Sequence, residues 1–364
     1  MKNNCQKNIN HTKQPLRLLR KSTSLLLPTS SDLPVLQVLQ VLQVLSGLPG
    51  LPTSSDLPEV TSVLPVLPSS PASSVLPALP ASSVFPVLPV LEEKNRHIRD
   101  ENIEFIEDSH TYIVNKKETD IYTSVTTFIH FHFSKFDSDK IILNMMKGKN
   151  WNKNNKYWGM SPGQIKQSWD DNGKEQAGLG TQLHYDIECF MNIEIKENNL
   201  QIDYKHKDIL EIYEFENPQA DSKQTARVEW DYFLNFVRDY PDMQPYRTEM
   251  RIYDDKLKIA GSIDMIYKND DGTFSIYDWK RSKGIETKNI YKKFSTTNCI
   301  SHLPDLNFYH YSLQLNLYKY ILEKNYNFKI KDLVLVQLHP NFGNYKLIQC
   351  LNLDKEIHDL ILSR

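Results

Sequence analysis

Two aspartates and a lysine stand at a spacing that suits phosphate chemistry. Asp264 and Asp278 fall on the two strands of one predicted hairpin, and counting from its turn places their carboxylates within several ångströms of each other. Lys280 follows Asp278 by two residues, so both side chains point to one face of the strand. Two carboxylates repel unless a cation lies between them, and this set could hold Mg²⁺ or Mn²⁺ beside a phosphate. The alternative is an exposed hairpin that carries these residues by chance.

Other polar residues could complete such a site. Glu249 lies on the preceding predicted strand, and the backbone carbonyl of Trp279 could supply another oxygen ligand. Each of two further pairs shares a helix face, because its members are spaced i, i+4: His184 with Glu188, and Gln314 with Tyr318. A single pair of this kind is typical of surface or core polar residues, whereas the combination in this order indicates a functional site.

Hydrophobic alternation and turn chemistry predict the strands that position these residues. The turn from Asn269 to Gly272 has glycine where a positive φ is needed. The predicted strands are a hairpin from Ile103 to Val114 turning near Asp108, then Tyr246 to Tyr253, Ile259 to Tyr267, Thr273 to Trp279, Leu333 to Leu338 and Tyr345 to Leu351. Strands followed by a helix and more strands favour an α/β or α+β fold with helices against a sheet.

Capping signals predict the helices. Ser161 as N-cap, Pro162 at the first position and Gln164 at the box position begin a helix that runs through Trp169. The glycines of segment 178–180 predict a break, after which Thr181 caps a second helix that ends near Met191. Further helices are expected over residues 222–239 and 309–324, and a surface loop over residues 147–158.

The motifs, taken in order, resemble the PD-(D/E)XK nuclease superfamily, and within it the RecB-like and YqaJ-like exonuclease branch. They are Gly-Thr-x-x-His-x-x-x-Glu over 180–188, Glu249, Gly-Ser-Ile-Asp over 261–264, Asp-Trp-Lys over 278–280 and Gln-x-x-x-Tyr over 314–318. Segments 108–112 and 124–126 are similar to the front of such proteins in large DNA viruses. The likeness covers roughly residues 100–352.

The resemblance implies a restriction-endonuclease-like core and Mg²⁺- or Mn²⁺-dependent hydrolysis of DNA in recombination, repair or genome processing. It assigns metal binding to Asp264, Asp278 and His184, catalysis to Lys280, DNA contacts to Gln314 and Tyr318, and second-tier roles to Glu249 and Glu188. It also implies DNA and a recombination or replication protein as partners. The branch with an iron–sulfur cluster has late cysteines that this chain lacks, so no such cluster is expected.

The residues after the hairpin predict a DNA-binding surface. From Lys280 to Lys293 the sequence has six cations and one acid, with Tyr291 and Phe294 interleaved. Nucleic-acid grooves combine such charge with aromatic side chains. The alternative is an ordinary solvated loop. Five cations are predicted to contact DNA: Arg281, Lys283, Lys288, Lys292 and Lys293.

Composition divides the chain of 364 residues into a leader and one domain. Residues 1–91 hold 13 of the 19 prolines and repeat the octapeptide Leu-Pro-Thr-Ser-Ser-Asp-Leu-Pro, so we expect them to be disordered. Residues 92–364 carry a formal net charge of -5, against -2 for the whole chain. This balance argues against a protein that coats nucleic acid by bulk charge, but it allows a localised basic groove.

Cysteines and apolar runs bear on location. Cys5, Cys189, Cys299 and Cys350 are scattered without a CxxC motif, which favours a reducing compartment and gives no zinc or disulfide signal. For a viral protein this would be the host cytoplasm or nucleus. No apolar run is long enough for a membrane span. The first 31 residues contain six basic and no acidic residues, so a mitochondrial transit peptide is an alternative.

Two other functions stay open at this point. A catalytically inactive nucleic-acid-binding or scaffold protein could use the same fold, although the complete set of Asp264, Asp278 and Lys280 argues against it. A glycosidase with a carboxylate pair suits the lysine and the basic run less well. Polarity of digestion, strand preference, discrimination against RNA and oligomeric state are not predicted.

Overall fold

The computed structural model describes residues 90–107, 109–117, 120–193, 203–217 and 227–364. All of them lie in one compact unit that begins after Leu33. The predicted leader, its repeats and Cys5 therefore lie outside the described residues, except that Val90 and Leu91 begin helix α2 (Val90–Lys94) and Leu91 is buried.

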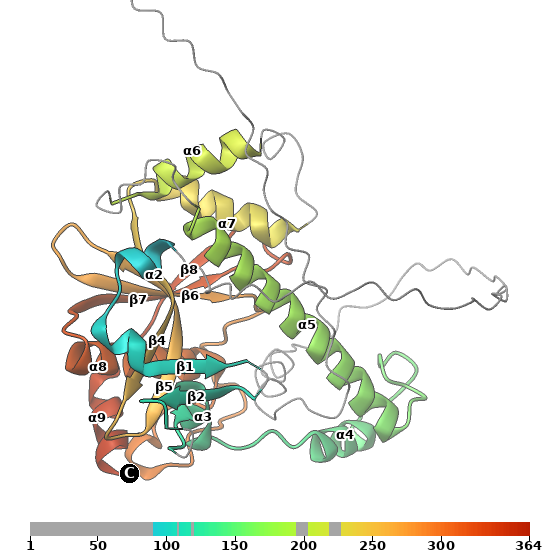
Figure 1. Ribbon diagram of the computed structural model, residues 1–364. Coiled ribbons are helices and arrows are strands. Elements are labelled where there is room, and N and C mark those ends of the chain that lie inside the picture. Colours follow the sequence, from blue (N-terminus) through green and yellow to red (C-terminus); the bar gives the residue numbers. More distant parts are fainter. Residues whose placement is uncertain (1–89, 108, 118–119, 194–202, 218–226) are drawn as a thin grey trace, which may run out of the picture. The chain divides into compact units, whose positions relative to one another are not determined.

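The described chain is an α+β arrangement of a mixed sheet flanked by helices (Figure 1). The helices are α2, α3 (Val125–Phe131), α4 (Ser138–Lys147), α5 (Pro162–Met191), α6 (His206–Glu216), α7 (Val228–Asp239), α8 (Asn307–Asn325), α9 (Asp354–Leu362) and the short 3-10 helices η1 (Ile98–Asn102) and η2 (Asn298–Ile300). The strands are β1 (Ile103–Ile106), β2 (Thr111–Val114), β3 (Thr123–Ser124), β4 (Gln244–Asp254), β5 (Ile259–Lys268), β6 (Phe274–Lys280), β7 (Ile330–Gln337) and β8 (Lys346–Gln349).

Strand β5 is the centre of the six-stranded sheet. It pairs antiparallel with β4 along one edge, and with β6 and the first residues of the sheet, β3, along the other. The β5–β6 ladder runs from Lys268 and Phe274 only as far as Met265 and Tyr277. Beyond that point β6 stays paired with β7, up to Lys280 and Gln337, and leaves β5. The two strands therefore separate at the two aspartates.

Each face of the sheet has its own core. On one face α3, α8 and α9 pack with sheet residues such as Ile252, Ile263 and Leu335. On the other face α5, α6 and α7 pack with Met265 and Trp279. Ile263 and Met265 are two residues apart and would share a face in a regular strand, yet they belong to different cores. The alternation of β5 thus changes phase at Asp264.

Most predicted strands and the helix over 309–324 are confirmed within one to three residues at each end. The hairpin β1–β2 and the hairpin β5–β6 have the expected antiparallel register, and Gly272 has a φ of +79°. Asp108, at the first of these turns, lies outside the described residues. The helix predicted over 222–239 begins at Val228 among the described residues, and positions 222–226 lie outside them.

The predicted break within residues 178–180 is wrong. Helix α5 runs unbroken over 30 residues from the Ser161 capping box to Met191, and Thr181 is an exposed interior position. Two glycines cost a helix about 1 kcal/mol each. Buried side chains near both ends outweigh that cost, because Ile165 and Trp169 pack against α4 while Leu183 and Ile187 pack against the sheet.

Within the described residues, every helix is too short or too polar to cross a bilayer.

Candidate active site

The separation of β5 from β6 creates the site. Once the ladder ends, the backbone N–H of Trp279 has no β5 carbonyl to bind, and it donates instead to Asp264 Oδ2 at 2.9 Å. This hydrogen bond fixes the Asp264 carboxylate between the diverging strands. Asp278 lies next to Trp279 and is 2% exposed, so the predicted pair of carboxylates does meet in a largely buried place.

Three side chains from three elements converge on the Asp264 side. Among the described residues, His184 of α5, Glu249 of β4 and Asp264 of β5 form one group whose potential ligand atoms lie within 4.8 Å of one another. Glu249 has a φ of +44°, a conformation that costs a non-glycine residue free energy inside a strand. The hydroxyl of Ser262 donates to Glu249 Oε2 at 3.0 Å and helps to hold the carboxylate.

The histidine is oriented by a backbone carbonyl. His184 Nε2 lies 2.9 Å from the Trp279 carbonyl oxygen, which can only accept, so Nε2 carries the proton. His184 Nδ1 then lies 3.5 Å from Asp264 Oδ2. A neutral imidazole in this tautomer directs a lone pair toward a carboxylate, which is unfavourable unless a cation lies between them. The Trp279 carbonyl, predicted as a ligand, is thus used to orient His184.

Excess negative charge is visible in the acids of the cluster. Burial, and then the nearby Asp264 carboxylate, raises the pKa of Glu249 to about 7. Burial also raises the pKa of Asp278 to about 6, with Lys280 opposing and Asp264 reinforcing the change. Two acids that resist ionisation beside a third indicate a place prepared for added positive charge.

Lys280 supplies one cation at the site. Its Nζ lies 2.6 Å from Asp278 Oδ2 and 4.6 Å from the centre of the Tyr311 ring of α8. Burial alone would lower the pKa of Lys280, but Asp278 and Asp264 outweigh burial and raise it. The ammonium is therefore charged at neutral pH and held beside the carboxylates by an ion pair and an aromatic ring.

The helix pair predicted to contact DNA is packed against the sheet. Gln314 and Tyr318 are 8% and 4% exposed, and Gln314 Nε2 donates to the Tyr318 hydroxyl at 3.2 Å. Tyr318 lies so close to β5 that a Cβ on Gly261 would come within 2.7 Å of its ring. The absent side chain of Gly261 is what lets Tyr318 reach the level of the aspartates.

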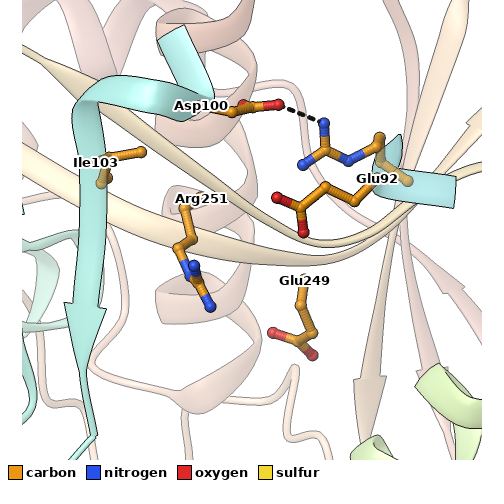
Figure 2. Close-up of a pocket in the computed structure, with 6 residues that line it drawn as sticks. Glu92, Asp100, Ile103, Glu249 and Arg251 are labelled. Carbon is orange, nitrogen blue, oxygen red and sulfur yellow. Dashed lines mark hydrogen bonds and ion pairs between the residues drawn. The ribbon is translucent and has the colours of Figure 1, made fainter. Parts of the chain in front are cut away.

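A small pocket opens beside Glu249 (Figure 2). Figure 2 shows Glu249 and Arg251 projecting from β4, with Glu92 of α2 pointing into the same space. The pocket is lined by Glu92, Asp100, Ile103, Arg247, Glu249 and Arg251. Glu188 is half-buried near this side, and burial raises its pKa while Arg251 opposes the change. Glu188 is absent from the three-ligand group, so it lies behind the site.

The basic run after the hairpin divides into two parts. Arg281 is not available to DNA in this structure, because its Nε donates to Glu229 Oε1 of α7 and its Nη1 to Gln176 Oε1 of α5, both at 2.7 Å. The prediction of a DNA contact by Arg281 is replaced by a structural ion pair whose side chains are 8% and 6% exposed. The other four residues are exposed, as predicted for a surface: Lys283, Lys288, Lys292 and Lys293.

Sequence reasoning ranked some residues too low and overlooked others. Glu249 was placed behind Asp278 as a metal ligand, whereas the three-ligand group contains Glu249 and leaves Asp278 to Lys280. Tyr311 was overlooked, although its spacing of three and seven residues from Gln314 and Tyr318 puts it on the same helix face. The Glu229 partner of Arg281 had no local signal.

Comparisons with known proteins assign no family. Searches against family models and curated proteins give no match. Among solved structures, the chain is similar to one described as "Crystal structure of SSO0001", with 14% identity over 76% of this chain and 84% of that chain and a TM-score of 0.26. A similarity of this quality establishes neither a shared fold nor a function.

Proposed function

We propose that this protein is a divalent-metal-dependent deoxyribonuclease of the PD-(D/E)XK type with a restriction-endonuclease-like core, acting as an exonuclease in DNA recombination, repair or genome processing. The observation that carries the proposal is the convergence of His184, Glu249 and Asp264 within 4.8 Å, next to the Asp278–Lys280 ion pair. Carboxylates around a cation with an adjacent ammonium are suited to phosphodiester hydrolysis, in which negative charge develops on phosphate oxygens.

The residues fit Mg²⁺ or Mn²⁺. Carboxylate oxygens are the ligands these cations prefer, and imidazole also suits Mn²⁺ more than Mg²⁺ in a mixed set. The raised pKa of Glu249, to about 7, and the lone pair that His184 directs at Asp264 are both relieved by a cation among these three residues. When bound, the ion would neutralise phosphate charge and lower the pKa of water.

The protein's own groups divide the remaining work. The Trp279 backbone orients both Asp264, through its N–H, and His184, through its carbonyl. The Lys280 ammonium, fixed by Asp278, donates to a phosphate oxygen as charge develops there. In the reaction a water oxygen attacks phosphorus, the bond from phosphorus to the leaving sugar oxygen breaks, and that oxygen takes up a proton.

DNA is the proposed substrate because of the surface next to Lys280. Lys283, Lys288, Lys292 and Lys293 are exposed, and Tyr291 and Phe294 between and after them are 66% and 46% exposed. Cations can follow phosphates, and exposed rings can stack on unpaired bases. A carbohydrate substrate would give this concentration of positive charge no role.

The test is incubation of the purified protein with end-labelled linear DNA and with covalently closed circular DNA, each with Mg²⁺ or Mn²⁺. We expect the linear DNA to be degraded and the circles to be spared, and the label released first gives the polarity. The Asp264→Asn variant keeps the size of the side chain and serves as the inactive control. Linear DNA left intact by the wild type, yet bound in a salt-dependent way, would favour a catalytically inactive DNA-binding protein.

A further inference from the structure

A second basic surface lies at the far end of α5 from the site. We call residues 138–169 the α4 platform: helix α4, the loop 148–161 and the first turns of α5. It has its own small core, in which Ile142, Tyr157, Ile165 and Trp169 are buried. Figure 1 shows α4 and the beginning of α5 extending away from the sheet. The candidate active site uses no residue of this platform.

The α4 platform is strongly positive although the domain is acidic. From Lys140 to Trp169 the sequence contains six lysines and no aspartate or glutamate. Four of these lysines have no ion pair within the described residues, and all four are exposed: Lys147, Lys149, Lys153 and Lys156. Trp158, beside them, is 46% exposed. In a chain segment of net charge -5, acids that could have neutralised this surface are absent from it.

The loop that carries these lysines is held in a defined shape. Asn155 connects three positions, since its side chain donates to the Asn150 carbonyl at 3.3 Å and accepts from the Tyr157 N–H at 2.9 Å. Tyr157 is buried against Trp169, and the Trp151 and Trp158 rings lie 5.6 Å apart. A preformed loop loses little conformational entropy when it binds, so its lysines are suited to recognition.

The platform stands at a fixed distance from the metal-binding residues. Trp169 and His184 lie on the same unbroken helix, 15 residues apart, which corresponds to about 22 Å at 1.5 Å per residue. Duplex DNA rises about 3.4 Å per base pair, so this length corresponds to roughly six or seven base pairs. A duplex whose end is at Lys280 is thus long enough to reach the platform after about half a helical turn.

We propose that the α4 platform binds the phosphate backbone of the DNA duplex several base pairs behind the scissile bond. This inference rests on the proposed nuclease function and deepens it, because it makes a duplex region part of the substrate. Lys149, Lys153 and Lys156 contact phosphates, and the exposed face of Trp158 packs on the sugar edge. An acidic protein surface would need the same charge but no particular length of ligand.

The test measures DNA binding by the full-length protein in EDTA, where no cleavage occurs, with fluorescent hairpin duplexes of about five and about twenty base pairs. The variant Lys149→Ala/Lys153→Ala/Lys156→Ala should bind the long duplex roughly tenfold more weakly, and its salt dependence should fall by about 0.9 in slope for each lost contact. Its affinity for the short duplex should be unchanged. The variant Lys329→Ala/Lys331→Ala/Lys355→Ala makes the same change of charge at exposed positions elsewhere and should match the wild type.

Three outcomes would overturn the inference: wild-type affinity of the platform variant for both duplexes, an equal loss for both, or displacement of the long duplex by polyglutamate as effectively as by unlabelled duplex. Cleavage of the short duplex by the wild type with Mn²⁺ is scored separately. Absence of that cleavage would count against the nuclease function, whereas the comparison of duplex lengths in EDTA reports on the platform alone.

Discussion

The site and the surfaces around it use charge in opposite ways. At the site, Asp278 and Lys280 are almost buried and lie 2.6 Å apart. On the loop after β6 and on the α4 platform, lysines are exposed and have no ion pair among the described residues. A buried charge is weakly screened and needs a matched partner, whereas an exposed charge is screened by salt within about 10 Å. We infer that buried charge performs the chemistry and exposed charge holds the substrate.

This comparison can be tested most strongly at Lys280. Replacement by methionine keeps the length of the side chain and removes the ammonium, so we expect the rate of DNA cleavage to fall by about 10²–10³-fold, the usual effect of losing a charge-stabilising donor. DNA affinity in EDTA should change by less than about threefold, since exposed lysines dominate binding. Single-turnover cleavage and fluorescence anisotropy measure the two quantities.

Lys280→Arg serves as the control for charge without geometry, because a guanidinium cannot reproduce the point contact with Asp278. It should stay well below the wild-type rate. A Lys280→Met variant that cleaves normally, or one that loses binding and cleavage in parallel, would contradict the division between the two kinds of charge.

The buried ion pair of Arg281 with Glu229 should affect stability. Burial opposes the ionisation of Glu229, but Arg281 outweighs it and lowers the pKa of that carboxyl. Arg281→Met leaves the carboxylate of Glu229 buried without its partner, which we expect to cost about 3 kcal/mol in the free energy of unfolding. Urea denaturation followed by tryptophan fluorescence measures the loss.

The double variant Arg281→Met/Glu229→Gln removes both charges and should recover part of that stability. If Arg281→Met leaves stability unchanged but weakens DNA binding like a loop lysine, Arg281 belongs with the exposed charges, as the sequence alone had suggested.

The smallest effect is expected from the loop lysines. The variant Lys288→Ala/Lys292→Ala/Lys293→Ala should lower DNA affinity by roughly tenfold at physiological salt and reduce the salt dependence, with no change in the urea midpoint. The cleavage rate at saturating DNA should stay near that of the wild type. The variant with Lys329, Lys331 and Lys355 replaced by alanine is again the matched control, and equal affinities of the two variants would show that the loop has no special role.

Local chemistry made part of this site predictable. The turn ending at Gly272 sets the register of β5 with β6, and the register brings Asp264 and Asp278 together. In contrast, the partner of Arg281 is 52 residues away on another helix, so no local pattern identifies it. The single helix α5 was missed for a related reason: the propensity of two glycines is local, whereas the two cores that hold the helix together are assembled by the tertiary fold.

The continuity of α5 also constrains how the chain can change in length. Each residue added or removed between Trp169 and His184 would turn the α4 platform by about 100° around the helix axis relative to the site. Seven residues make nearly two full turns, so a change of seven would move the platform by about 10 Å and return it to almost the same angle. Length changes in this helix are therefore expected to preserve the arrangement only in steps of about seven residues, each equivalent to about three base pairs of DNA.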